Sequence, residues 1–123
     1  MHRHFLFLAG ILGFLGVLAG TFGAHGLKGK LEPALLETFE VGVRYHLVHA
    51  VALLAVSLMV GRDNPRAIGV AGLAFIVGIC IFCGSLYALA LTGVKTFGMV
   101  APIGGASFMI GWAALAVAGW KKK

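Results

Sequence analysis

Charged side chains divide this sequence into four long apolar stretches. The stretches contain no Lys, Arg, Asp or Glu, and they run from Phe5 to Leu27, Tyr45 to Gly61, Ala67 to Val94 and Thr96 to Trp120. A helix rises about 1.5 Å per residue, so about 20 apolar residues cross a hydrocarbon core of about 30 Å. The pattern therefore predicts an all-α integral membrane protein with four transmembrane helices in a single domain. The expected spans are about 5–25, 43–61, 67–92 and 98–120.

The segment between the first two spans has its own pattern. Pro33 suits the first turn of a helix, and the residues after it mix apolar with acidic side chains. We expect a short interfacial helix at about 33–42, which either turns into the second span or runs straight on into it. Glu40 and Arg44 stand four apart, in the order that favours a helical ion pair.

Composition supports the membrane interpretation. Hydrophobic residues make up 60% of the 123 residues and charged residues only 11%, whereas about a quarter of a soluble domain is charged. The net charge of +6 raises the question of nucleic acid. However, the cations lie between the apolar stretches and near the chain ends, not along one face with stacking aromatics. We therefore expect membrane lipid around the chain and no nucleic acid as a partner.

The positions of the charges also predict an orientation. Four spans place both termini and the second loop on one side, with Arg3, Arg62, Arg66, Lys121, Lys122 and Lys123. The opposite side holds fewer cations together with three glutamates: Lys28, Lys30, Arg44 and Lys95, with Glu32, Glu37 and Glu40. Because the more basic side usually faces the cytoplasm, both termini are expected there.

Glycine recurs at helical spacing inside the spans. The first span carries a stripe of Gly10, Gly13, Gly16, Gly20 and Gly23, and the fourth contains Gly104, Gly105 and Gly111. In a bilayer, helices associate through close contact of small residues, because lipid is as apolar as leucine. These glycines therefore predict helix-packing faces, either within the four-helix bundle or towards another subunit.

Polar side chains gather in one leaflet of the expected topology. Such groups are costly in a membrane and are therefore candidates for a functional site. The candidate cluster comprises His25, Arg44, Tyr45, His46, His49, Ser85 and Tyr87. Three of its members, His25, His46 and His49, are candidate metal ligands, since neutral imidazole suits copper or zinc. Proton or substrate transport is a further possibility, and the remaining one is simple hydrogen bonding across helices.

Four ordered motifs add a family resemblance. They are Gly23-Ala24-His25-Gly26-Leu27-Lys28, then Tyr45 with His49-Ala50, then Gly84-Ser85-Leu86-Tyr87, and finally Pro102-Ile103-Gly104-Gly105 with Gly111-Trp112. This pattern resembles the YgdD/YwdK-type family of small bacterial membrane proteins, a family of unknown function that is similar to a small eukaryotic transmembrane protein. The resemblance covers nearly the whole chain and implies a four-span protein of the bacterial inner membrane. It also implies that glutamine is common at position 46, which weighs against a three-histidine metal site.

The residues favour a structural or accessory role. No metalloprotease motif, phosphate-binding loop or catalytic triad is visible, so we expect neither an enzyme nor a cofactor. The favoured hypothesis is a membrane component that forms a homo-oligomer or joins other membrane proteins in a larger complex. The alternative is a transporter or metal-handling protein that uses the His/Tyr cluster.

Overall fold

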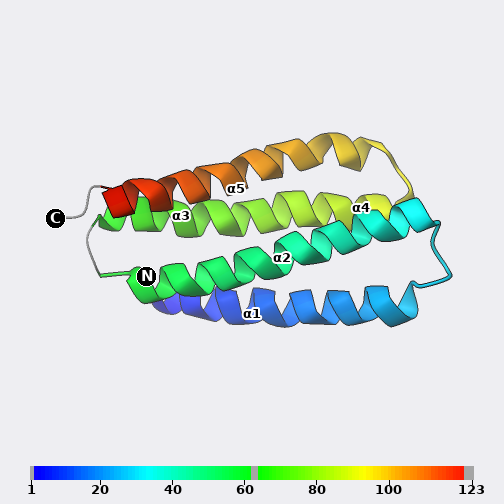
Figure 1. Ribbon diagram of the computed structural model, residues 1–123, viewed down its shortest axis with the longest axis horizontal. Coiled ribbons are helices and arrows are strands. Elements are labelled where there is room, and N and C mark those ends of the chain that lie inside the picture. The colour runs from blue at the N-terminus through cyan, green and yellow to red at the C-terminus, as the bar shows by residue number, and fades with distance from the viewer. Residues whose placement is uncertain (1, 62–63, 121–123) are drawn as a thin grey trace.

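Four helical rods lie side by side in a computed structural model that describes residues 2–61 and 64–120 (Figure 1). The first rod is α1 (His2–Thr21) with the π-helical turn η1 (Phe22–Gly26), and the second is α2 (Pro33–Met59). The third consists of α3 (Pro65–Gly78), the π-helical turn η2 (Ile79–Cys83) and α4 (Gly84–Thr92), and the fourth is α5 (Thr96–Trp120). The described residues contain no β-strand. Arg62 and Lys121 to Lys123, used above to predict the orientation, lie outside them.

Proline and glycine mark the ends of these rods. Pro33 and Pro65 occupy the first turns of α2 and α3, where a missing backbone N–H costs nothing. Gly93 ends α4 with a φ of 74°, a left-handed conformation that glycine adopts without strain, and its N–H donates to the carbonyl of Leu89. The three-residue link before α5 can therefore reverse the chain sharply.

All four rods are long and apolar enough to cross a bilayer. The segments Arg3–Gly26, Pro33–Met59, Pro65–Thr92 and Thr96–Trp120 have mean hydropathies between 1.6 and 2.5. Both described ends of the chain lie at one end of the bundle, and the links 27–32 and 93–95 lie at the other, called the loop end here (Figure 1). The predicted all-α fold with four transmembrane helices is confirmed.

The second rod begins earlier than the apolar pattern alone indicated. Residues 33–42 are the first turns of α2 and run straight on into the span, the second of the two arrangements considered above. Pro33 and Met59 each stand 13 residues from His46, so His46 lies at the middle of this helix and not near its start. The acidic side chains of Glu37 and Glu40 are exposed on these first turns.

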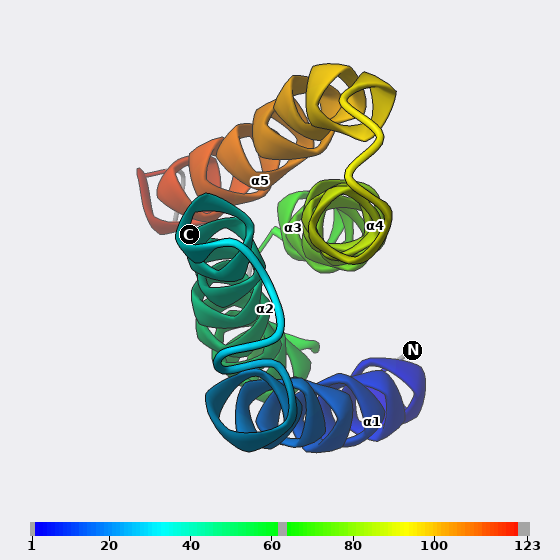
Figure 2. The same cartoon turned by 90° about the vertical axis from the view of Figure 1, so that its right-hand side faces the viewer.

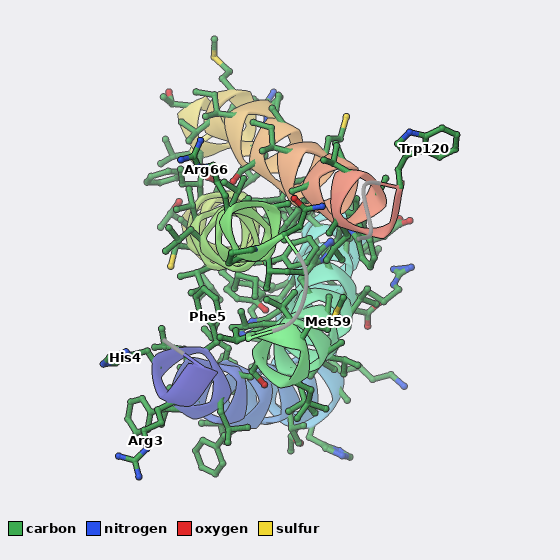
Figure 3. The ribbon with its side chains drawn as sticks, turned by 90° about the vertical axis from the view of Figure 1, so that its left-hand side faces the viewer. Arg3, His4, Phe5, Met59, Arg66 and Trp120 are labelled. Carbon is green, nitrogen blue, oxygen red and sulfur yellow. The ribbon has the colours of Figure 1, made fainter. Side chains whose placement is uncertain are left out.

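The rods are not equally buried. Seen along the bundle, α2 and the α3–α4 rod form the middle, while α1 and α5 lie on the outside (Figure 2). In the most apolar 18-residue segment of each rod, 17% of the segment is buried in the first rod and 22% in α5, against 44% in α2. At the termini end, Phe5 points from α1 towards α3, where its ring contacts Gly72 (Figure 3). Trp120, on the outside of α5, points away from the bundle at the same end.

The glycines expected to mediate packing divide into two groups. On α1, a Cβ at Gly16 would lie 2.6 Å from the Leu47 side chain, and one at Gly23 would lie 2.9 Å from the Phe39 ring, both on α2. Gly10 and Gly13, in the same stripe, have nothing within 4 Å of such a Cβ. On α5, a Cβ at Gly104 would collide with the backbone of Phe82 in η2 and one at Gly111 would lie 2.5 Å from the Phe75 ring, and these two glycines are buried.

Candidate functional site: a hydrogen-bonded polar centre

His46 connects three of the rods. Its Nε2 lies 2.8 Å from the backbone oxygen of Leu12 on α1, and its Nδ1 lies 2.8 Å from the hydroxyl of Tyr87 on α4. A carbonyl oxygen only accepts, so the Nε2–H donates to it. Nδ1 of the neutral ring is then an acceptor, and the Tyr87 hydroxyl donates to it. The buried imidazole thereby ties α2 to both α1 and α4.

His49 takes the opposite tautomer. The indole Nε1–H of Trp112 on α5 donates to His49 Nε2 over 3.0 Å, and an indole nitrogen is only ever a donor. Nε2 is therefore the acceptor, and the Nδ1–H donates to the backbone oxygen of Tyr45, 2.8 Å away. This second buried histidine ties α2 to the fourth rod.

Aromatic rings hold His49 in place. The imidazole stacks on Phe108 with ring centroids 3.7 Å apart and an interplanar angle of 11°. The rings of Phe75 and Trp112 flank it at 5.4 and 5.8 Å. Such close neighbours restrict rotation of the imidazole and keep Nε2 directed at Trp112.

Glycine makes the contact between His46 and Tyr87 possible. A Cβ at Gly42 on α2 would lie 2.8 Å from the Tyr87 ring. Because glycine has no such atom, the ring lies close against α2 and its hydroxyl reaches His46, one turn further along the helix. Phe39 packs on the same ring, with centroids 4.9 Å apart.

His46 and His49, with their partners Leu12, Tyr45, Tyr87 and Trp112, are called the polar centre here. Its hydrogen-bonding groups are paired within the protein. All four imidazole nitrogens are engaged, and no buried side-chain nitrogen or oxygen among the described residues lacks a hydrogen-bond partner. A metal ion needs a free imidazole lone pair, and here each of the two acceptor nitrogens already accepts a hydrogen bond. The arrangement therefore joins the rods and leaves neither acceptor nitrogen free to bind a metal ion.

The structure brings together only part of the predicted cluster. Four of its members form two hydrogen-bonded pairs: His46 with the Tyr87 hydroxyl, and His49 with the backbone oxygen of Tyr45. The Ser85 hydroxyl instead donates to the backbone oxygen of Ile81 within its own rod. His25 is exposed in η1, and Arg44 is exposed on the outside of α2.

The three candidate metal ligands do not converge. No group of three His, Cys, Asp or Glu side chains in the described parts of the chain is placed to hold a metal ion. Residues three apart point about 60° away from each other around a helix, so His46 faces α1 and α4 while His49 faces α5.

Sequence reasoning missed the partners on the neighbouring rods. Phe108 and Trp112, which cover and bind His49, stand four apart and so share one face of α5. That spacing is the signal that the sequence offers, and Trp112 also belongs to the family-like motif Gly111-Trp112. Nothing in the sequence marked the backbone oxygen of Leu12 as an acceptor.

Comparison with known proteins places the chain in a family. A family model described as "Protein of unknown function (DUF423)" matches residues 19–105, which include His46, His49 and Tyr87. The chain belongs to the DUF423 family. This membership confirms the resemblance to YwdK-type proteins, since the Bacillus subtilis relative is named UPF0382 membrane protein YwdK. That relative is 37% identical over 95% of this chain and 96% of its own length.

Other DUF423 relatives are named in the same way. A UPF0382 membrane protein of Haemophilus influenzae is 40% identical over 100% of this chain and 98% of its own length. One from Staphylococcus aureus is 38% identical over 95% of both chains. No solved structure matches the chain. The family thus identifies a membrane protein with bacterial relatives, and its description assigns no activity.

Proposed function

We propose that this protein is a structural or accessory component of the bacterial inner membrane that self-associates or joins a larger membrane complex. The observation that carries the proposal is the closed polar centre, in which both buried histidines already use both ring nitrogens. General acid–base or nucleophilic catalysis needs a side chain within reach of a substrate. Here His46 and His49 are hydrogen-bonded to backbone oxygens and to the side chains of Tyr87 and Trp112, so neither has a free ring nitrogen for such a step.

The exposed side of α5 supports the association part of the proposal. Small residues that the bundle does not cover occur along this helix, namely Ala106, Ala113, Ala116 and Gly119. Small residues let a second helix approach closely, which is the main source of helix association in lipid. A neighbouring membrane helix against this side would bury surface that the single chain leaves open.

Photo-cross-linking in membranes tests this proposal. In a Cys80→Ser background, which removes the exposed cysteine, Ala113→Cys carries a thiol-attached photoprobe on the open side of α5. We expect a discrete adduct with a second copy or with one defined membrane protein. Leu73→Cys, on the exposed side of α3, is the matched control and should give a different or weaker pattern. Adducts with lipid alone at both positions would contradict the proposal.

A further inference from the structure

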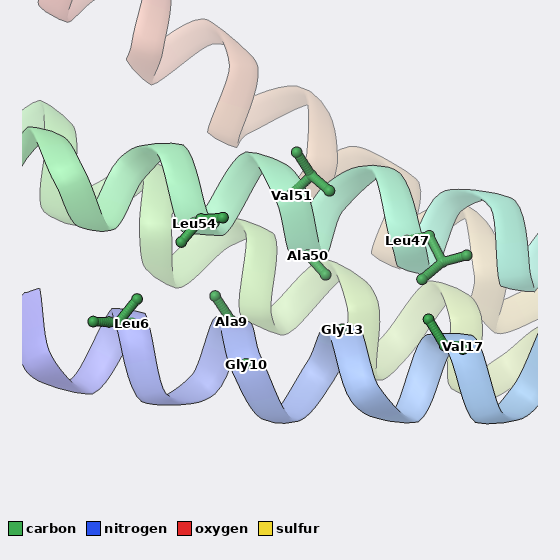
Figure 4. Close-up of a pocket in the computed structure, with 9 residues that line it drawn as sticks. All are labelled: Leu6, Ala9, Gly10, Gly13, Val17, Leu47, Ala50, Val51 and Leu54. Carbon is green, nitrogen blue, oxygen red and sulfur yellow. The ribbon is translucent and has the colours of Figure 1, made fainter.

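An apolar groove runs along the seam between α1 and α2. Its volume is about 330 Å³, and its walls include Leu6, Ala9 and Val17 on α1 with Leu47 and Leu54 on α2 (Figure 4). Gly10 and Gly13 also line it, and neither has an atom within 4 Å of the place where a Cβ would be. The groove is therefore open because these two positions carry no side chain, and its surface suits a hydrocarbon chain.

A second hollow continues the groove towards the loop end. It measures about 350 Å³, shares Leu47 with the first, and lies between Gly20 and Gly23 on the first rod and Glu40 and Arg44 on α2. The seam thus changes from charged to wholly apolar along its length. The same change occurs in a bilayer leaflet between the headgroups and the acyl chains.

The two charged residues of the hollow are not paired with each other. Glu40 and Arg44 are exposed, and the ion pair expected from their spacing is not formed in the described structure. Four residues of helix separate them by about 6 Å along the axis, with Glu40 nearer the loop end. From the loop end inwards, the order is therefore carboxylate, guanidinium, apolar groove.

We propose that this groove binds a zwitterionic aminophospholipid. The ammonium group of its headgroup pairs with Glu40, its phosphate pairs with Arg44, and one acyl chain lies along the glycine-lined seam. The headgroup presents ammonium, then phosphate, then acyl chain from water inwards, which is the order of the partners along α2. An anionic phosphatidylglycerol offers Glu40 no cation, and a phosphatidylcholine offers it no N–H donor.

The order of charges favours a lipid over a second copy of the chain. In a symmetric pair with both copies oriented alike, equivalent residues lie at the same depth across the two-fold axis. Glu40 of one copy would then lie level with Glu40 of the other and Arg44 level with Arg44, so that opposite charges of the two copies are offset by about 6 Å along the axis. A zwitterionic headgroup gives each side chain an opposite charge.

Native mass spectrometry of the full chain in mild detergent tests the assignment. The protein is offered equal amounts of phosphatidylethanolamine, phosphatidylglycerol and phosphatidylcholine with identical acyl chains. We expect phosphatidylethanolamine to be retained about two- to fivefold over each of the others, the range expected of partly exposed ion pairs. Glu40→Gln should remove this preference, while Glu37→Gln, an exposed carboxylate outside the groove, should keep it.

A second pair of variants tests the groove itself. Gly13→Leu places a bulky side chain in the seam at a position where a Cβ has nothing within 4 Å, and it should lower retention of all three lipids while the thermal stability of the protein stays unchanged. Gly84→Leu, at another helical glycine with open space around it, is the matched control and should bind as the wild type does. Equal retention of the three lipids by the wild type, or a preference that survives Glu40→Gln, would overturn the proposal. A dimer that dissociates in Gly13→Leu with lipid binding unchanged would also overturn it, by assigning the groove to a second copy.

Discussion

At the scale of single residues, His46 and His49 show how two identical side chains acquire different roles. His46 donates through Nε2 to a backbone oxygen, whereas His49 accepts at Nε2 from an indole. Each tautomer is selected by a partner that has one hydrogen-bonding option, a carbonyl in the first case and a tryptophan in the second. Within the membrane no water replaces a lost partner, so each hydrogen bond contributes to holding the rods together.

Trp112→Phe should destabilise the bundle. The variant keeps most of the ring packing against Phe75 and His49 but leaves His49 Nε2 without a donor. Interhelical hydrogen bonds in membranes contribute about 0.6 kcal/mol on average and up to about 1.7 kcal/mol, so we expect a loss in that range. Unfolding of the purified protein in mild detergent measures it. Trp120→Phe, at a residue 88% exposed, is the control, and equal stability of the two variants would contradict the role given to Trp112.

Tyr87→Phe should also lower stability, because His46 Nδ1 would lose the hydroxyl that donates to it. The size of the loss should again be about 0.6–1.7 kcal/mol. The matched control is Tyr45→Phe, since Tyr45 uses its backbone oxygen and its ring in the polar centre. The same unfolding measurement compares them. A Tyr87→Phe variant as stable as the wild type would mean that the hydrogen bond to His46 contributes nothing.

At the scale of elements, apolar length predicted the four rods well but not where the second one begins. A division at charged residues misses the start of a helix that carries charges in its first half, as α2 does at Glu37, Glu40 and Arg44. The π-helical turns at 22–26 and 79–83 were also unpredictable. They depend on how the backbone adjusts to its neighbours, and the residues at 79–83 are as apolar as the α-helical residues beside them.

Glycine spacing predicted shared faces but not contacts. Regular spacing shows that Gly10, Gly13, Gly16, Gly20 and Gly23 lie on one side of the first rod. It does not show how near the next helix lies at each level. The structure places Gly16 and Gly23 against α2 and leaves Gly10 and Gly13 beside an open groove.

Two adjacent glycines on α5 should respond very differently to alanine. In Gly104→Ala the new methyl would meet the backbone of Phe82, which cannot move without separating α5 from η2. Overpacking of this kind typically costs about 1–3 kcal/mol. Gly105→Ala meets nothing closer than 3.9 Å and should be close to neutral or slightly stabilising. Thermal stability in detergent distinguishes the two variants. Similar melting temperatures would show that α5 does not pack this closely against η2.

At the scale of the whole molecule, the sequence indicated which residue types form the polar centre but not how they are joined. The partners of His46 and His49 on other rods lie 34, 41 and 63 residues away along the chain. Periodicity gives the face of each helix, whereas the level at which two helices meet depends on packing along their whole length. The pairing of His46 with the Leu12 oxygen and of His49 with Trp112 therefore does not follow from the sequence.

The charge distribution makes a prediction about orientation. With both termini in the cytoplasm, Lys28→Cys at the loop end should react with a maleimide that cannot cross the inner membrane. The cells are treated so that the reagent passes the outer envelope while the inner membrane stays intact. Arg66→Cys, exposed at the termini end, should react only after lysis, with both variants made in the Cys80→Ser background. The reverse pattern of labelling would place the termini outside.

If the polar centre is structural and the protein acts by assembly, the extracted protein should be associated with a partner and should hold no metal ion. The most direct test is native mass measurement combined with elemental analysis on one sample extracted in mild detergent. We expect a defined oligomer, or a complex with another membrane protein, that carries no stoichiometric metal. A monomer that binds copper or zinc in proportion to the chain, and loses it in His46→Ala and His49→Ala, would contradict both roles.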